Sequence, residues 1–260
     1  MNKICKDLAD EQAALDDILS CIDYDDWKVV TPFYQWTIHD EIGHIAYYDN
    51  RSLLAVTDPD GFAEHCKNIN FADFDGVFEH TLEKFRAMKS PDLMTFWIKE
   101  RTAMINAFKV LDPKARLPWY GPTMSAKSFA TARIMETWAH GQDIADALKI
   151  DRPTTNRLKH IAILGVNTFA WSYKSKKIKE PEQKVYVELS SPSGDIWRWG
   201  DERCKNKVTG SACDFCLVVT QRRNILDTDL CAQGSVAKEW MRIAQAFAGP
   251  AETGPEPGRF

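Results

Sequence analysis

The stretch METWAHGQD, residues 135–143, lies in the middle of a predicted helix and places Glu136 and His140 four positions apart. Side chains with this separation lie on one face of a helix, so both can reach a single cation. Two ligands are not a site, because a catalytic zinc takes three protein ligands and keeps one position for water or substrate. The spacing alone also fits a salt-bridged helix face. The decisive question is whether a third ligand lies elsewhere in the chain.

A histidine on a neighbouring helix is the expected third ligand. His44 lies inside a predicted helix whose N-terminus Thr37 can cap, and Gly43 and Ala46 beside it are small enough to let another helix approach closely. The remaining histidines lie at a helix start or in polar surroundings: His39, His65, His80 and His160. His44 is therefore the strongest partner for the pair on the later helix.

Two charged residues on the later helix add to the predicted site. Asp143 lies one turn after His140 and can accept the second imidazole proton, which fixes the tautomer of a metal-bound histidine. Arg133 lies three residues before Glu136 on the same face. Its guanidinium can neutralise a carboxylate or hold an anionic substrate.

Apolar residues recur at helical spacing through the first part of the chain, which predicts a helical bundle over residues 1–152. Pro and Gly then mark the breaks between helices. The predicted helices cover residues 3–21, 38–57, 74–88, 91–110 and 126–149.

The second half changes character and predicts a small mixed α/β domain over residues 153–250. It starts with a predicted helix over 155–176 and continues with a β-hairpin formed by KVYVELSS and IWRWG. A third strand, a helix over SACDFCLVVTQRRN, a short strand and a terminal helix follow. The tail, residues 251–260, is rich in Gly and Pro and is predicted to be flexible. The fold class is therefore α+β.

Composition excludes several partners. The chain has 260 residues and a net charge of -4, which gives no electrostatic drive toward nucleic acid or an anionic membrane. We find neither a secretory signal nor an apolar window long enough to span a bilayer, so we expect a cytoplasmic protein. The seven cysteines are expected to be reduced thiols. Cys213 and Cys216 form a CxxC, which we interpret as part of a buried helix rather than a redox or zinc motif.

Several motifs together resemble a known family. DDW, TPFYQWTIHDEIGHIAYYD and ARIMETWAHGQDIADAL resemble the DinB-like metal-binding bundle of the mycothiol-dependent maleylpyruvate isomerase superfamily. KVYVELSSPSGDIWRWG, VTGSACDFCLVVTQRR and DLCAQGSVAKEWMRIAQAF resemble the C-terminal domain that accompanies this bundle. The stretch LPWYGPTMSAKSFATARIMETWAHGQD resembles the sequences of an uncharacterised bacterial branch of this superfamily. The resemblance implies a DinB-like four-helix bundle followed by a small α/β domain.

The resemblance also implies a set of site residues. In such proteins a histidine of the second helix, with a Glu and a His on the last bundle helix, holds a divalent metal, typically zinc. The matching positions are His44, Glu136 and His140. An arginine after the buried helix of the second domain faces the site in the isomerase, and TQRR places Arg222 at that position with Arg223 beside it.

The loop PWYGPTMS, residues 118–125, precedes the helix that carries the ligand pair. Tyr120 and Met124, with Trp119, can form the wall of a cofactor or substrate pocket, or they can seal the end of the bundle. Ser125 can cap the helix that follows. The sequence leaves both interpretations of the aromatic residues open.

These features lead to one expected function and two alternatives. We expect a metal-dependent enzyme, with zinc as the cation, that activates a low-molecular-weight thiol such as mycothiol for isomerisation or transfer on a small unsaturated carboxylic acid. One alternative is a thiol-independent metallo-hydrolase, hydratase or lyase. The other is a non-catalytic metal- or ligand-binding protein. The expected partner is a small-molecule substrate, and the sequence does not specify the oligomeric state.

Overall fold

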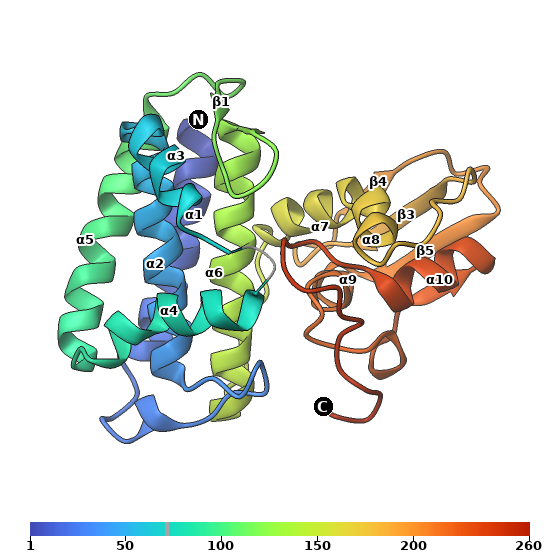
Figure 1. Cartoon of the computed structure of the whole chain (residues 1–260). Coiled ribbons are helices and arrows are strands. Elements are labelled where there is room, and N and C mark those ends of the chain that lie inside the picture. Colours follow the sequence, from blue (N-terminus) through green and yellow to red (C-terminus); the bar gives the residue numbers. More distant parts are fainter. Residues whose placement is uncertain (71–72) are drawn as a thin grey trace. The chain divides into compact units, whose positions relative to one another are not determined.

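The computed structural model describes residues 1–70 and 73–260, and the chain divides into two compact units (Figure 1). The first unit is Met1–Asp151 and the second is Arg152–Phe260. This division lies one residue before the boundary predicted from the sequence. Within the described residues, no helix combines the length and apolarity that crossing a membrane requires.

Four long helices form the bundle of the first unit. They are α1 (Asn2–Leu19), α2 (Ile38–Thr57), α5 (Ser90–Lys109) and α6 (Ala126–Leu148). Helices α2 and α1 each pack against both α5 and α6, as Figure 1 shows. Two buried apolar clusters fill the space between the helices, one around Phe108 and Phe129 and the other around Ile42 and Trp97.

Capping residues fix the starts of the two helices that carry the predicted ligands. Thr37 accepts a hydrogen bond from the backbone N–H of Asp40, and the Asp40 side chain accepts one from the backbone of Thr37. The Ser125 hydroxyl accepts the backbone N–H of Ser128 at the start of α6. Both caps were predicted from the sequence and are confirmed. They satisfy N–H groups that the first turn of a helix leaves without an intrahelical partner.

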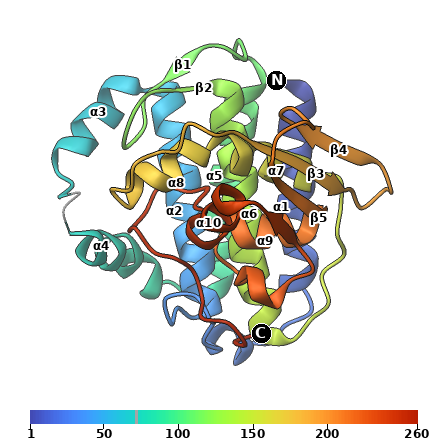
Figure 2. The same ribbon diagram turned by 90° about the vertical axis from the view of Figure 1, so that its right-hand side faces the viewer.

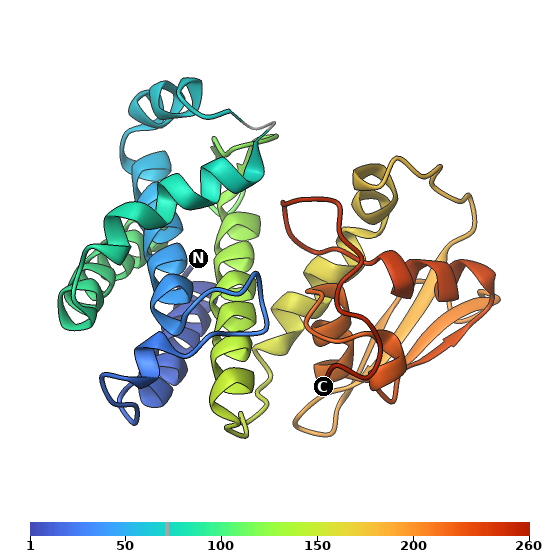
Figure 3. The same ribbon diagram turned by 60° about the horizontal axis from the view of Figure 1, so that its bottom comes forward.

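Among its described residues, the first unit also contains two shorter α-helices, a 3-10 helix over Asp26–Lys28, and the antiparallel strands β1 (Arg116–Leu117) and β2 (Met124–Ser125). Helix α3 (Pro59–Lys67) begins immediately after α2, because Asp58 caps it and Pro59 suits the first helical position. The sequence prediction ended α2 correctly at Asp58 but missed α3. Helix α4 (Phe74–Arg86) lies across α2 (Figure 3). A Cβ atom at Gly43 would lie 3.0 Å from the Cβ of Phe85, so the small residue beside His44 permits this close crossing.

The second unit is a small α/β domain. Its sheet has the strand order β4-β3-β5-β6, with β3 and β5 parallel and the outer pairs antiparallel. Figure 2 shows β3, β4 and β5 together with the helices of this unit. The elements are α7 (Leu158–Asn167), α8 (Phe169–Ser175), β3 (Val185–Ser190), β4 (Ile196–Trp199), β5 (Asn206–Ser211), α9 (Ala212–Val219), β6 (Cys231–Gln233) and α10 (Ser235–Ile243).

The predicted hairpin and the predicted α9 are present. Strands β3 and β4 pair in the register Val187 opposite Trp199, and β5 leads directly into α9. The single helix predicted over 155–176 is divided into α7 and α8 at Thr168, whose hydroxyl bonds to the backbone carbonyl oxygen of Leu164. The order of the remaining elements is as predicted, but α9 ends at Val219 and α10 ends at Ile243, about five residues before the ends of the helices predicted there.

Residues 251–260 contain no helix or strand, as the Gly- and Pro-rich sequence predicts. Side chains of the segment that follows α9 nevertheless hold this tail. Gln221 Nε2 donates to the backbone oxygen of Glu252 at 2.6 Å, and Asn224 Nδ2 donates to that of Pro255 at 3.0 Å. The tail therefore lies along residues 221–227 and is hydrogen-bonded to them.

Candidate metal centre

Helices α2 and α6 bring the three predicted ligands together. His44 projects from α2, and Glu136 and His140 project from α6. One ligand atom from each residue lies within 4.8 Å of the other two. Both histidines are buried, whereas the Glu136 side chain keeps 24% of its surface exposed. The arrangement thus has one side open to an incoming molecule.

The distances fit a shared cation. His140 Nε2 lies 3.4 Å from Glu136 Oε2, and the His44 and His140 rings are 4.6 Å apart between centroids. Two ligands that bind one tetrahedral zinc at 2.0–2.2 Å are separated by about 3.3 Å. Two imidazoles and one carboxylate form an established catalytic zinc set, which leaves one position for water or substrate. The residues present therefore fit a divalent metal.

The other ring nitrogen of His140 faces a residue that sequence reasoning missed. His140 Nδ1 lies 2.7 Å from Glu41 Oε2, which is a short hydrogen-bond distance. Asp143 Oδ2, the acceptor predicted from the sequence, lies 3.7 Å from the same nitrogen. Glu41 rather than Asp143 is thus the nearer acceptor. A signal was present, since Glu41 lies three residues before His44 and shares its helix face.

Burial perturbs the pKa of Glu41. This side chain is inaccessible to solvent, and its burial raises its pKa to about 7. The charge of Asp143 acts in the same direction, while the hydrogen bonds to His140 and Thr31 favour the charged form. The pKa of Glu41 therefore lies above its ordinary value because burial outweighs these hydrogen bonds.

Aromatic rings surround the two imidazoles. The Trp36 ring is nearly parallel to that of His140 at 6.1 Å and lies 4.9 Å from that of His44. Phe33 contacts His140 at 5.5 Å, and Tyr48 contacts His44 at 4.7 Å. Burial raises the pKa of the Tyr48 hydroxyl, which therefore stays protonated. The two imidazoles are buried beside these rings, whereas Glu136 keeps part of its surface exposed to solvent.

Comparison with known proteins identifies the family. Residues 8–145 match the family model of the mycothiol maleylpyruvate isomerase N-terminal domain, which is more than half of the chain. The chain belongs to this family. Two uncharacterized proteins of Mycobacterium tuberculosis are each 43% identical to it over 244 residues, covering 94% of this chain and 95% of the relative.

Solved structures show the same fold. The crystal structure of the mycothiol-dependent maleylpyruvate isomerase matches with a TM-score of 0.56 and 14% identity, over 85% of this chain and 89% of that one. A mutant of that isomerase matches with the same TM-score and 13% identity. The predicted membership of this superfamily, and the predicted fold of a helical bundle followed by an α/β domain, are thus confirmed.

Arg133, predicted to face an anion, has a partner inside the bundle. Its Nε donates to Asp49 Oδ1 at 2.9 Å, and both side chains are buried. Asp49 Oδ2 also accepts from Trp97 Nε1 at 2.8 Å and from Gln12 Nε2 at 3.3 Å. Arg133 therefore neutralises a carboxylate of α2, which is one of the two roles predicted for it. Its role toward a substrate stays a prediction.

The loop that contains Tyr120 and Met124 packs onto the end of the bundle. The Trp119 ring stacks on Phe62 at 5.5 Å, and Met124 contacts the buried cluster around Phe129. The Tyr120 hydroxyl lies 3.0 Å from His65 Nε2. The observed packing follows the second interpretation of this loop, in which it seals the bundle. A cofactor contact at Tyr120 or Met124 stays a prediction.

Arg222 and Arg223 lie in the second unit, directly after α9. The Arg222 side chain is buried, and its Nη1 donates to the backbone oxygen of Thr220 at 2.8 Å. The Arg223 guanidinium lies 3.9 Å from the ring centroid of Phe260. Their predicted roles toward substrate and cofactor stay predictions.

The CxxC motif lies in α9, as predicted. All seven cysteines, each within the described part of the chain, are free thiols. Cys216 is completely buried and its Sγ lies 3.5 Å from the backbone oxygen of Leu158. Burial raises the pKa of both Cys213 and Cys216. A redox-active thiol requires a lowered pKa, so these residues behave as small apolar side chains.

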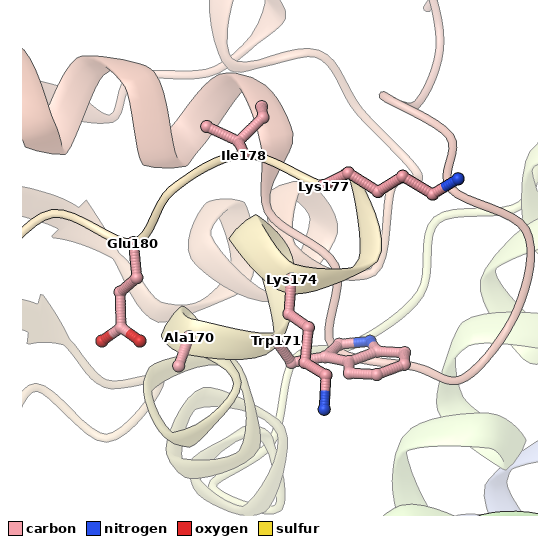
Figure 4. Close-up of a pocket in the computed structure, with 6 residues that line it drawn as sticks. All are labelled: Ala170, Trp171, Lys174, Lys177, Ile178 and Glu180. Carbon is pink, nitrogen blue, oxygen red and sulfur yellow. The ribbon is translucent and has the colours of Figure 1, made fainter.

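A separate open pocket of about 540 Å³ lies within the second unit (Figure 4). Its side chains come from α8 and the segment that follows, and they are Ala170, Trp171, Lys174, Lys177, Ile178 and Glu180. This lining includes one carboxylate and neither a histidine nor a cysteine. It therefore offers no metal site and contains none of the residues predicted from the sequence.

Proposed function

We propose that this protein is a metal-dependent enzyme that activates a small thiol for isomerisation or transfer on a small unsaturated carboxylic acid. The observation that carries the proposal is the convergence of His44, Glu136 and His140 from two helices that are distant in sequence. A structural zinc site prefers four protein ligands, whereas a catalytic site uses three. The three-ligand arrangement therefore favours chemistry over a purely structural role.

The three ligands suit zinc in particular. Two neutral imidazoles and one carboxylate leave a divalent cation with a net positive charge, which attracts an anionic sulfur or oxygen. When bound, such a cation lowers the pKa of a thiol or water, and a thiol made nucleophilic in this way can add reversibly to an alkene and allow rotation about the resulting single bond. The family name supports mycothiol as the thiol.

The chain's own residues supply binding and exclusion of water. The rings of Phe33 and Trp36 cover the imidazoles, so an incoming molecule meets the site on the side of Glu136. Arg222 is the proposed partner of a substrate carboxylate, since the guanidinium fork matches two oxygens. Tyr48, held protonated by burial, can donate a hydrogen bond to negative charge next to His44.

An assay of thiol dependence tests the proposal. Zinc-loaded protein is incubated with maleylpyruvate, with and without mycothiol, and the formation of the trans isomer is followed. We expect turnover only when the thiol is present, and loss of that turnover in Glu136→Ala. Turnover without thiol would instead support chemistry by metal-bound water. Stoichiometric metal with no binding of thiol or acid would support a non-catalytic metal-binding protein.

A further inference from the structure

We infer that Glu41, held in place by Thr31, is the positioning residue that orients His140 for metal binding. The inference rests on the proposed metal centre and adds a residue from α2 to a site whose ligand pair lies on α6. It concerns the affinity for the metal, so it can be tested without knowing the substrate.

Distances on the two sides of the His140 ring support this assignment. On the Nε2 side, Glu136 Oε2 lies at 3.4 Å, which matches the separation of about 3.3 Å between two ligands of one zinc. On the Nδ1 side, Glu41 Oε2 lies at 2.7 Å, which is too short for two ligands of one ion and matches a charge-assisted hydrogen bond. One nitrogen therefore suits the cation and the other suits the carboxylate.

A competing arrangement uses the Nδ1 side for a metal. Glu41, His140 and Asp143 also have ligand atoms within 4.8 Å of one another. All three side chains are buried, however, so that side offers no exposed ligand where a substrate could enter. The short hydrogen bond to Glu41 also requires a proton on Nδ1, and a protonated nitrogen has no lone pair for a metal. Asp143, at 3.7 Å, adds negative charge beside the ring without replacing Glu41.

Thr31 fixes the second oxygen of the Glu41 carboxylate. The Thr31 hydroxyl donates to Glu41 Oε1 at 2.6 Å, and this side chain is also buried. The backbone N–H of Thr31 donates to the carbonyl oxygen of Trp36 at 2.7 Å, which holds the segment before α2 in a defined position. Glu41 is thus held from one side and bonds to His140 from the other.

The consequence for His140 is a fixed tautomer. A proton on Nδ1 that is shared with Glu41 leaves the Nε2 lone pair directed toward Glu136. The carboxylate also makes the imidazole a more basic ligand. Residues that bond to metal-bound histidines in this way typically contribute 10–100-fold to metal affinity.

Substitutions at each member of the chain of hydrogen bonds test the inference. Glu41→Met keeps the volume and removes the acceptor, Glu41→Gln keeps an acceptor without the charge, and Thr31→Val removes only the supporting hydroxyl. Asp143→Asn tests the competing acceptor. Glu100→Gln is the matched control, because Glu100 is another buried carboxylate of the bundle and accepts from Asn50 at 2.7 Å.

Two readouts are measured: the dissociation constant for zinc, by competition with a chelating dye, and the His140 tautomer, by NMR of the nitrogen-labelled imidazole in metal-free protein. We expect Glu41→Met to weaken zinc binding by about 10–100-fold and to abolish the preference for the Nδ1-protonated tautomer. Glu41→Gln should weaken binding less, Thr31→Val by only a few-fold, and Glu100→Gln not at all. Circular dichroism confirms that each variant is folded.

Specific outcomes would overturn the inference. Native zinc affinity in Glu41→Met, or a larger loss in Asp143→Asn, would show that Glu41 does not orient His140. A cobalt(II) spectrum that changes coordination in Glu41→Gln would show that Glu41 is itself a ligand. If the native chain binds no metal, the proposed function fails, while the tautomer of His140 in native protein and in Glu41→Met still tests the orientation separately.

Discussion

Helices α2 and α6 both contribute to two polar clusters, about one turn of helix apart, that differ in their balance of hydrogen-bond donors, and α1 and α5 add donors to one of the two. The metal cluster consists of His44, Glu136 and His140. The arginine cluster consists of Asp49, Arg133, Trp97 and Gln12. Asp49 lies five residues after His44 on α2, and Arg133 lies three residues before Glu136 on α6. Two such close neighbours in one bundle show how structural and functional polar groups can be distinguished.

In the arginine cluster, every oxygen of the carboxylate receives an N–H group. Asp49 Oδ1 accepts from Arg133, and Oδ2 accepts from Trp97 and Gln12. Opposite charges and matched donors make this cluster complete without a ligand. In the metal cluster, by contrast, two imidazoles and a carboxylate direct ligand atoms at one another within 4.8 Å. This arrangement suits a cation, so the first cluster is expected to govern stability and the second to govern binding.

The largest expected effect on stability comes from breaking the arginine cluster. Asp49→Ala leaves the Arg133 guanidinium buried without its counter-charge, which costs about 3–5 kcal/mol of unfolding free energy. Urea unfolding of metal-free protein measures this loss. The double variant Asp49→Ala with Arg133→Met should recover part of it. A loss below about 1 kcal/mol would remove the distinction between the clusters.

Metal loading should stabilise the protein through the other cluster. Zinc at a free concentration 100-fold above its dissociation constant adds about 2.7 kcal/mol to the unfolding free energy, because only the native state binds it. Urea unfolding with and without zinc measures the gain. His140→Ala serves as the comparison and should gain nothing. An equal gain in this variant would place the metal elsewhere.

A smaller effect is expected from one donor of the arginine cluster. Trp97→Phe keeps an aromatic ring and removes the N–H group that donates to Asp49 Oδ2 at 2.8 Å. A hydrogen bond to a charged group contributes about 2 kcal/mol. Urea unfolding should show a loss of that size with unchanged zinc affinity. A variant that loses zinc affinity instead would indicate that the two clusters are coupled.

The smallest effect is expected at Glu136 in metal-free protein. This side chain is partly exposed, so Glu136→Gln should change the unfolding free energy by less than about 0.5 kcal/mol. The measurement uses urea unfolding in the presence of a chelator. A cost comparable to that of Asp49→Ala would assign Glu136 a structural role and contradict the comparison.

Local signals explain what the sequence predicted about the fold. Caps such as Thr37 and Ser125 act within one turn, so the starts of α2 and α6 could be located from the chain alone. The error at Pro59 has the same local origin, because a proline both ends one helix and suits the first position of the next. The division of α7 from α8 at Thr168 had no Pro or Gly to signal it.

For the candidate site, the sequence predicted the metal ligands but not the residues that form hydrogen bonds with them. Glu136 and His140 are four residues apart, and His44 followed from the expected third ligand and the family resemblance. The partners Glu41 and Asp49 lie 99 and 84 residues from the side chains they contact. Such pairs depend on how α2 meets α6, which the spacing along one helix does not specify. Sequence reasoning therefore chose Asp143, the acceptor nearest along the chain.

The most direct test of the account is the metal content of the purified chain. Inductively coupled plasma mass spectrometry is applied to the native protein and to His44→Ala and Glu136→Ala, with far-ultraviolet circular dichroism to confirm folding. We predict about one divalent ion per native chain and loss of most of it in both variants, with the helical signal retained. A native chain without metal, or variants that keep a full equivalent of it, would contradict the account.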